Sequence, residues 1–392
     1  MKILYFSPHP HINLSAPSGP GTHIREVIAG FEAQGHQVIR FIEGGEKIET
    51  VASTIHFKRR PWKKLIPTFI WETLRDLQMI RLDRQIEIRL TAFLEKEMPD
   101  LIYERSCYGM GAGMRSAKKL GIRYAVEMNA PYPEEKAEMQ GKSLLQFIGT
   151  RHEKTQVLSA YRTIVVSSAM KNYLLEKTKV NPDQILVVAN AVNPAHIQAN
   201  PIRQSEIRSK FGINDSHTVF GFVGSIFPYH GVDIMIESFA AIEKESANAR
   251  MLIVGSGEIL PKLQQRVQDL KLENKIYFTG NVPHNSVYDY LDVMHITIMA
   301  RSNWYGSPVK IFEYGAMNKA IIAPHVVPVL DVMQHEKDGL LIEANQEELT
   351  NSMRTMLHHP ENRKRMAMTF HEKVMREHTW TRVAQQILAS CQ

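Results

Sequence analysis

Short apolar runs alternate with helically spaced apolar residues along the first half of the chain. The run at 3–6 has the length of a buried strand, and 38–42 indicates the next strand. Between them lie a loop rich in Pro, His, Ser and Gly and then apolar residues at helical spacing, which are Ile24, Val27, Ile28 and Phe31. This strand–helix–strand unit predicts a parallel sheet with right-handed crossovers. Further strands are expected at 101–103, 124–127, 163–166 and 185–188, and a long helix at 71–96.

The second half repeats this alternation after a stretch of turn residues at 190–194. The pattern predicts an α/β protein with two doubly wound domains, whose ligand loops lie at the carboxyl ends of the strands and face a cleft. We expect one domain over 1–195, a second over 196–372, and a last helix within 373–392 that packs back on the first domain. The strands predicted for the second domain are 219–223, 251–254, 276–278, 296–299 and 320–323, and the helices before the tail are 232–241, 260–270 and 286–291.

Length and composition fit this two-domain organisation. The chain has 392 residues, of which 44% are hydrophobic and 22% charged, as in globular proteins. Its two cysteines, Cys107 and Cys391, indicate a reducing compartment rather than a disulfide framework. The apolar start is too short for a signal peptide, and no apolar run reaches membrane-spanning length. These features predict a cytoplasmic protein.

The net charge of +6 is compatible with phosphate ligands, anionic lipid or nucleic acid and does not choose among them. Nucleic acid is the weakest reading, because the basic residues are spread along the chain without stacking aromatics. One local cluster, Lys58 to Lys64, lies beside tryptophan and aliphatic residues and suits peripheral contact with an anionic membrane surface. An ordinary solvated loop explains this cluster equally well.

The stretch 305–314 contains the most informative motif of the chain. Gly306 lets the backbone approach a ligand closely, Ser307 is a good N-cap, and Pro308 suits the first position of a helix. The backbone amides that follow point at whatever lies before the helix, where the helix dipole favours negative charge. The motif therefore predicts an anion site at a helix start.

Two side chains refine this prediction. Lys310 adds a positive charge to the amides near Val309, which suits a phosphate. Glu313 lies on the same helix face, three residues on, and could accept hydrogen bonds from sugar hydroxyls. A phosphate beside a ribose means a nucleotide.

Other glycine-rich loops follow predicted strands but are less specific. Gly19 and Gly21 fall between the first strand and the first helix, where a doubly wound domain binds phosphate; a tight turn capped by Thr22 explains them equally well. His230 lies just before a helix, where its imidazole could face a phosphate, and a surface histidine is the alternative. Gly255 belongs to a Gly-x-Gly without the third glycine of the dinucleotide fingerprint.

No metal site is predicted. His9 and His11 form a His-x-His pair, but no third ligand follows at a suitable spacing. We therefore expect neither a metal nor another cofactor.

In order and spacing, these motifs resemble glycosyltransferase family 4, whose retaining enzymes have two facing Rossmann-like domains, the GT-B fold. The resemblance covers nearly the whole chain, and the "S-P-x-K-x-F-E-Y" form at 307–314 is that of a subset of the family. The matching segments are 101–106, 126–131, 187–192, 222–224 with 230–233, 252–257, 278–282 and 307–316.

The resemblance implies a donor site in the second domain. Glu313 matches the Glu that hydrogen-bonds the donor ribose, and Asn281 and Val282 match the backbone that meets the base. Gly19 and Gly21 match the loop of the first domain that approaches the diphosphate. The remaining donor-site residues that the resemblance implies are Gly224, Ser225, Gly255, Gly306, Ser307, Pro308 and Val309.

The chain departs from the family pattern at three donor-side positions. Tyr305 stands where the family usually has a first Glu, and Ser225 and His230 stand where an Arg and a Lys usually clamp the diphosphate. Two fixed cations are thereby lost where charge develops on the leaving group. Lys310 and His230 could partly replace them.

The first domain would then hold the acceptor. Arg105 stands near the position at which many relatives place a histidine of the catalytic site. We predict Lys310, His230, Glu127 and Arg105 as catalytic residues, and Asn129 and His23 on the acceptor side. For Glu127, a buried structural acceptor of loop amides is nearly as good an explanation.

The resemblance implies a retaining glycosyltransferase that moves a hexose-type sugar from a nucleotide-diphospho donor to an acceptor hydroxyl. UDP-sugar is favoured over GDP-sugar, and the acceptor belongs to polysaccharide, glycolipid or natural-product biosynthesis. The lost cations at Ser225 and His230 keep one alternative open, a non-catalytic partner or regulator that binds sugar nucleotides. A second alternative is another reaction on the same scaffold, that of a GT-B sugar-nucleotide epimerase.

Overall fold

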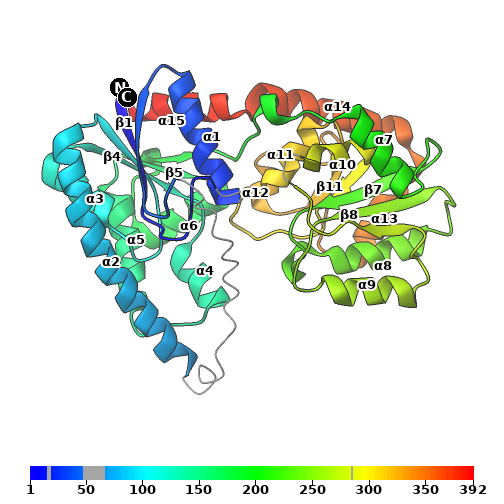
Figure 1. Ribbon diagram of the computed structural model, residues 1–392, viewed down its shortest axis with the longest axis horizontal. Helices are drawn as coiled ribbons and strands as arrows, with labels where there is room; N and C mark the ends of the chain where they lie inside the picture. Colours follow the sequence, from blue (N-terminus) through cyan, green and yellow to red (C-terminus); the bar gives the residue numbers. More distant parts are fainter. Residues whose placement is uncertain (16–18, 47–66, 284–285) are drawn as a thin grey trace. The chain divides into compact units, whose positions relative to one another are not determined.

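The computed structural model describes residues 1–15, 19–46, 67–283 and 286–392 (Figure 1). It consists of two compact units. Unit 1 comprises Met1–Val188 and Thr381–Gln392, and unit 2 comprises Ala189–Trp380. The first change of unit thus lies a few residues before position 195, and the chain returns to unit 1 a few residues after position 372.

Unit 1 is built on a six-stranded parallel sheet. The strand order is β2-β1-β3-β4-β5-β6, so the direction of winding reverses between β1 and β3. Ligands of open α/β sheets bind at such a reversal, beyond the carboxyl ends of the strands. The strands are β1 (Lys2–Ser7), β2 (Gln37–Ile42), β3 (Leu101–Arg105), β4 (Arg123–Met128), β5 (Arg162–Val165) and β6 (Ile185–Val187).

Helices connect these strands, and local signals in the sequence set their ends. Ser167 caps α6, because its side chain accepts a hydrogen bond from the amide of Met170. The last helix belongs to unit 1, where Arg123 and Arg162 donate to its final carbonyl groups. The helices are α1 (Gly19–Ala33), α2 (Thr68–Glu97), α3 (Ala112–Leu120), α4 (Tyr132–Met139), α5 (Gln146–Ser159), α6 (Ser168–Thr178) and α15 (Trp380–Cys391).

Unit 2 has a second six-stranded parallel sheet, in the order β12-β11-β10-β7-β8-β9. Here the winding reverses between β7 and β10. The prediction of two doubly wound α/β domains is confirmed, although the sequence analysis missed β12. The strands are β7 (Thr218–Val223), β8 (Ala249–Val254), β9 (Ile276–Phe278), β10 (Ile296–Ile298), β11 (Ala320–Pro324) and β12 (Leu340–Ile342).

The core of unit 2 lies on both faces of this sheet. Phe220 and Phe222 of β7 point into one apolar cluster with α8 and α13, while Val219 and Val223 point into the other with α11 and α14. This alternation is that of a strand covered on both faces. The helices are α7 (Pro201–Lys210), α8 (Val232–Ile242), α9 (Leu260–Asp269), α10 (Val287–Val293), α11 (Val309–Ala316), α12 (Val327–Leu330), α13 (Gln346–His358) and α14 (Pro360–Glu377).

None of the helices in the described part of the chain is long and apolar enough to cross a bilayer. The basic cluster at 58–64 lies outside the described residues.

Candidate functional site

The predicted donor-site residues of unit 2 gather at the carboxyl edge of its sheet. The loop after β7, residues 224–231, and the loop after β10, residues 299–308, flank the point where the winding reverses. The start of α11 follows directly. The topology therefore places these loops at the customary ligand site of a doubly wound domain.

Lys310 lies in the first turn of α11, and its side chain is half-buried, with the ammonium nitrogen shielded from solvent. Among the described residues its ammonium has no hydrogen-bond partner, and Nζ lies 4.6 Å from the centre of the Phe222 ring. Burial lowers the pKa of Lys310 to about 8, although Glu313 partly opposes this shift. A buried ammonium that has a ring face and one nearby carboxyl group, but no hydrogen-bond partner among the described residues, favours the arrival of an anion.

Glu313 sits one turn further along α11. Burial raises the pKa of its carboxyl group above the ordinary value, and the charge of Lys310 opposes this rise. Lys310 and Glu313 are close enough on α11 for their charges to interact, as expected for two residues on one face of a helix. A carboxyl group in this position can accept hydrogen bonds from hydroxyl groups.

The prediction that Ser307 caps α11 is wrong. The helix begins at Val309, its N-cap is Pro308, and no side chain caps it. The Ser307 hydroxyl instead accepts the amide of Asn190 at 3.0 Å, and the Asn190 side chain donates to the Ser307 carbonyl at 2.7 Å. The first amides of α11 consequently receive no side-chain cap, as an incoming anion requires.

Gly306 is tied to the loop rather than open to a ligand. Its amide donates to the Asn303 side chain at 2.6 Å. Tyr305, in the position of the expected first Glu, packs edge-on against the exposed Trp304, with ring centres 5.3 Å apart. This loop thus presents aromatic surface where the family pattern has a carboxylate.

Two glycines let the loops of unit 2 pack closely. Gly224 has φ +144°, and a Cβ there would lie 3.2 Å from Lys310 Nζ. Gly255 has φ +129°, and a Cβ there would overlap the carbonyl oxygen of Gly224. The Gly255 amide donates to the Gly280 carbonyl at 3.0 Å. Gly255 therefore supports the loop that borders Lys310.

His230 is a neutral group in this structure. Burial and the nearby charge of Lys310 lower its pKa to about 4. Its Nδ1 atom donates to the Ser225 carbonyl, which leaves Nε2 as the unprotonated nitrogen. The ring also packs on Tyr229, with ring centres 4.4 Å apart. His230 therefore stands at the position of the lysine that the family pattern places at the diphosphate, but it does not supply a positive charge.

Arg301 is a cation that the sequence analysis missed. It follows β10 by three residues, and a Cβ at Gly231 would lie 3.0 Å from its side chain. Its guanidinium lies 3.5 Å from both the Asp233 carboxylate and the Pro228 carbonyl. Its position just after the carboxyl end of a predicted strand could have identified it as a candidate ligand-binding residue.

Asn281 and Val282 follow β9 by a few residues, at the same edge of the sheet. Asn281 is exposed and Val282 is half-buried. The bridge between Gly255 and Gly280 fixes the backbone just before them. Their backbone is therefore held next to the glycine loops, as a base-reading segment would need.

In unit 1, the predicted acceptor-side residues converge on one carboxylate. Glu127, at the end of β4, is buried, and its Oε1 atom lies 2.7 Å from His23 Nε2 and 2.8 Å from Arg105 Nη1. Asn129 donates to the same oxygen, and the Tyr103 hydroxyl donates to Oε2 at 2.7 Å. The structure thus brings together all four residues that were predicted for this side.

The charges around Glu127 explain its ionisation. Burial alone would raise the pKa of Glu127, but His23 and Arg105 outweigh burial and hold it well below the ordinary value. With three hydrogen-bond donors on its two oxygens and the His23 ring at ion-pair distance, the carboxylate is engaged in positioning its neighbours. This geometry favours the structural explanation of Glu127 over a role as proton acceptor.

The glycine loop of unit 1 begins a helix. α1 starts at Gly19, with Gly21 buried in its first turn. The interpretation as a tight turn capped by Thr22 is therefore wrong, and the Thr22 hydroxyl accepts a hydrogen bond from Arg25 instead.

His9 lies on the loop that follows β1. Burial and the nearby His11 and Arg105 lower the pKa of His9 to about 4.

Family models match both halves of the chain. Residues 17–196 match the model described as Glycosyltransferase Family 4, and residues 203–369 match the model described as Glycosyl transferases group 1. The two matches follow one another and cover most of unit 1 and most of unit 2.

Curated relatives are distant. The GPI3 subunit of phosphatidylinositol N-acetylglucosaminyltransferase from Saccharomyces cerevisiae is 22% identical over 57% of this chain and 48% of its own length. The chain thus spans about half the length of the first curated relatives it matches. Alpha-monoglucosyldiacylglycerol synthase of Streptococcus pneumoniae is 20% identical over 83% of this chain and 75% of that protein.

Solved structures share the fold over the full length. HepE of Anabaena in complex with UDP superimposes with a TM-score of 0.72, covers 99% of both chains and is 15% identical. The chain therefore has the GT-B architecture, and two successive matches make it similar to the family 4 glycosyltransferases over most of its length.

Proposed function

We propose that the protein is a retaining glycosyltransferase that moves a hexose-type sugar from a nucleotide-diphospho donor to an acceptor hydroxyl. One observation carries this proposal above the others. The Lys310 ammonium is buried at the start of α11 without a described hydrogen-bond partner, beside a carboxyl group at Glu313. A diphosphate and a ribose would satisfy these two groups together.

The donor diphosphate would lie against Lys310 and the first amides of α11. Their charge and dipoles stabilise the negative charge that grows on the leaving diphosphate. Neutral His230 offers an unprotonated Nε2 atom, which would accept a hydrogen bond from a hydroxyl group of the nucleotide sugar. The negative charge of a bound diphosphate would raise the pKa of His230. Glu313 would hold the ribose, and the backbone at 281–282 would meet the base.

We favour UDP as the nucleotide of the donor. HepE, which shares the fold, has been solved with UDP and with UDP-glucose. The chemistry at Lys310 requires only a diphosphate, so the sugar and the base are set by the loops around it. No metal would be needed, since the cation and the helix dipole are supplied by the chain.

The proposed chemistry is substitution on the same face of the sugar. The bond between the anomeric carbon and the diphosphate oxygen breaks, and the acceptor oxygen forms the new bond on that face. The leaving diphosphate takes the proton of the acceptor hydroxyl. The Arg105–Glu127 cluster of unit 1 would orient the acceptor, and an acceptor from glycolipid, polysaccharide or natural-product biosynthesis fits the family.

The first experiment is a thermal-shift panel of nucleoside diphosphates and their sugars, because a ligand that binds the native state raises its melting temperature. Ligands that give a shift are then incubated with the protein, and free nucleoside diphosphate and sugar are followed. Slow release of nucleoside diphosphate with sugar of retained anomeric configuration supports the proposal. Binding without release would establish a sugar-nucleotide-binding regulator instead, and conversion of the sugar without release would establish an epimerase.

A further inference from the structure

The first half of the long helix α2 turns its acidic side chains inward. Glu72, Asp76 and Asp83 are each less than 5% exposed, although α2 runs along the outside of unit 1 (Figure 1). Acidic residues are rarely buried unless they are paired. Over the first half of α2 the inward face is therefore polar, which is the reverse of an ordinary surface helix, whereas the second half buries Ile86, Leu90 and Leu94 in the usual way.

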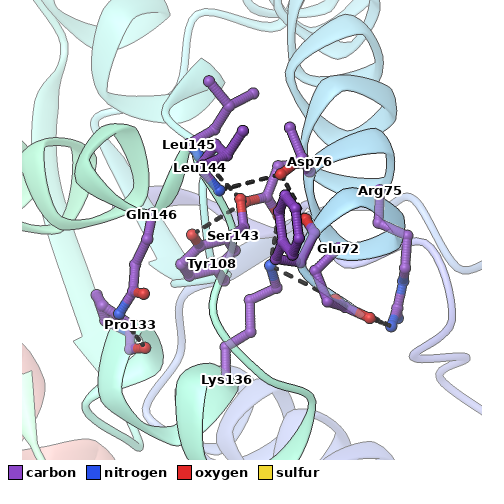
Figure 2. A network of polar contacts seen from close by, with 12 residues as sticks. Glu72, Arg75, Asp76, Tyr108, Pro133, Lys136, Ser143, Leu144, Leu145 and Gln146 are labelled. Carbon is purple, nitrogen blue, oxygen red and sulfur yellow. Dashed lines mark hydrogen bonds and ion pairs between the residues drawn. The ribbon is translucent and has the colours of Figure 1, made fainter. Parts of the chain in front are cut away.

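Specific partners hold these acids in place. Figure 2 shows Lys136 of α4 between Glu72 and Asp76, with Nζ 2.6 Å from Asp76 Oδ1 and 3.6 Å from Glu72 Oε2. The Ser143 hydroxyl donates to Asp76 at 2.5 Å. Asp83 accepts the first amides of α3 at 2.9 Å. The inward face is thus fixed by ion pairs and capping, and α2 cannot rotate to bury its other side.

The outward face of α2 is apolar and cationic. Its residues recur at 70, 74, 77, 81, 84 and 88, a spacing of four and three that makes one stripe along a helix. Ile70, Leu74 and Leu77 are 40%, 47% and 40% exposed, and Arg81 and Arg84 continue the stripe. Three large aliphatic side chains thus face solvent where polar ones would be expected.

The segment between α4 and α5 extends this apolar stripe. The amide of Leu144 donates to the Thr73 hydroxyl of α2 at 3.0 Å, so this segment lies directly beside the stripe. Leu144 is 66% exposed, and Phe147 at the start of α5 is 65% exposed. We call Ile70, Leu74, Leu77, Leu144 and Phe147, with Arg81 and Arg84, the α2 surface.

Charge decides which partner fits the α2 surface. Over residues 67–86 all acidic side chains are buried, and Arg81 and Arg84 form no ion pair with another described residue. A helical protein partner would have to bury both arginines, because they continue the aliphatic stripe. A membrane would accept the aliphatic side chains in its hydrocarbon edge and the arginines among anionic headgroups. In the sequence, the five cations at 58–64 have the same sign.

We propose that the α2 surface docks unit 1 onto an anionic lipid bilayer, with α2 lying along the interface. The aliphatic side chains and Phe147 enter the headgroup boundary, and Arg81 and Arg84 pair with lipid phosphates. The helix lies on the membrane and does not span it. This binding requires neither donor nor turnover, so it is separable from the proposed transferase activity.

The test is flotation of the full chain with vesicles of phosphatidylcholine alone or of equal parts phosphatidylcholine and phosphatidylglycerol. We expect binding to the anionic vesicles only, weakened by salt. The double variant Leu74→Ser/Leu77→Ser should bind at least tenfold more weakly, and so should Arg81→Gln/Arg84→Gln, whose residual binding should no longer depend strongly on salt.

Matched controls come from unit 2. Ile202→Ser/Met368→Ser removes two exposed apolar side chains, and Lys244→Gln/Lys262→Gln removes two exposed cations. Both should bind vesicles like the unaltered chain. Far-ultraviolet circular dichroism and the melting temperature verify that all variants fold.

Three results would overturn the proposal. The first is absence of binding to anionic vesicles, and the second is equal binding by the α2 variants and the controls. The third is a concentration-dependent dimer, seen by sedimentation velocity without lipid, that both α2 variants abolish. That result would assign the surface to a second copy of the chain.

Discussion

At the scale of single residues, Lys310 is the group whose environment says most about chemistry. Its ammonium is buried and meets the Phe222 ring, and among the described residues Glu313 is the opposite charge that acts on it. The cost of keeping it charged is recovered when an anion binds. This makes the protonation of Lys310 a measurable reporter of diphosphate binding.

UDP affinity should therefore fall as the pH rises through about 8. The pKa of Lys310 is lowered to about 8 in the free protein, so the ammonium that attracts the diphosphate is lost above that value. Isothermal titration calorimetry between pH 6.5 and 9.5 measures this directly. Lys310→Met, which keeps the volume of the side chain, should bind UDP at least tenfold more weakly and with a flat profile. An unchanged profile in this variant would remove Lys310 from the site.

In unit 1, the most informative single residue is Glu127, whose carboxylate holds the surrounding side chains in position. Glu127→Gln should destabilise unit 1 by about 3–5 kcal/mol, because it leaves Arg105 buried without its carboxylate. Urea unfolding followed by circular dichroism measures the loss. As a control, Asn129→Ala removes one of three hydrogen-bond donors to Glu127 and should cost about 1 kcal/mol. A fully stable Glu127→Gln protein would favour a catalytic role for this carboxylate over a positioning one.

At the scale of elements, the sequence predicted well where one physical signal dominates. Fully apolar runs such as 219–223 and 251–254 became strands, because only a strand buried on both faces hides every residue of such a run. The start of α11 was misjudged, because Ser307 satisfies the usual local signal for an N-cap. Its hydroxyl is instead used by Asn190, a contact between residues far apart in sequence that local signals cannot reveal.

The pairing of the glycine loops in unit 2 gives a prediction of its own. Gly255→Ala should cost more than about 2 kcal/mol, because the new methyl group meets the Gly224 carbonyl and the backbone has φ +129°. It should also weaken UDP binding, since Gly224 borders Lys310. The matched variant Gly280→Ala has φ +70° and open space, so it should cost only about 1 kcal/mol. Equal costs in urea unfolding would show that backbone strain alone matters.

At the scale of the whole molecule, two doubly wound domains could be read from the alternation of strands and helices. The loops that carry the donor site follow from that topology, since they flank the reversal between β7 and β10. The burial of acidic side chains on the first half of α2 could not be predicted from the sequence. Its apolar residues have helical spacing, and only the tertiary partners of Asp76 and Asp83 show which face points inward.

The stability of the molecule should also have a characteristic dependence on pH. Burial raises the pKa values of Glu104 and Glu153 to about 8, so these groups hold protons that the unfolded chain has released. Their contribution is full below about pH 4.5 and is lost as the pH rises towards 8. Half-buried histidines act in the opposite direction. The pKa values of His9 and His295 are lowered to about 4, so their contribution is lost as the pH falls below 6.5.

These opposing groups predict a stability plateau between about pH 4.5 and 6.5 and a decline from there to 8. Glu104→Gln should make that decline shallower, by up to about 1.4 kcal/mol for each pH unit, because the amide cannot ionise. The new side chain can still accept from the Tyr124 hydroxyl, which now bonds Glu104 at 2.8 Å. Guanidinium unfolding at pH 6.5 and 8 gives the slope. The exposed Glu347→Gln is the control and should leave it unchanged. An equally steep decline in Glu104→Gln would mean that Glu104 is ionised in the folded protein, with its charge balanced by Tyr124 and Gln156.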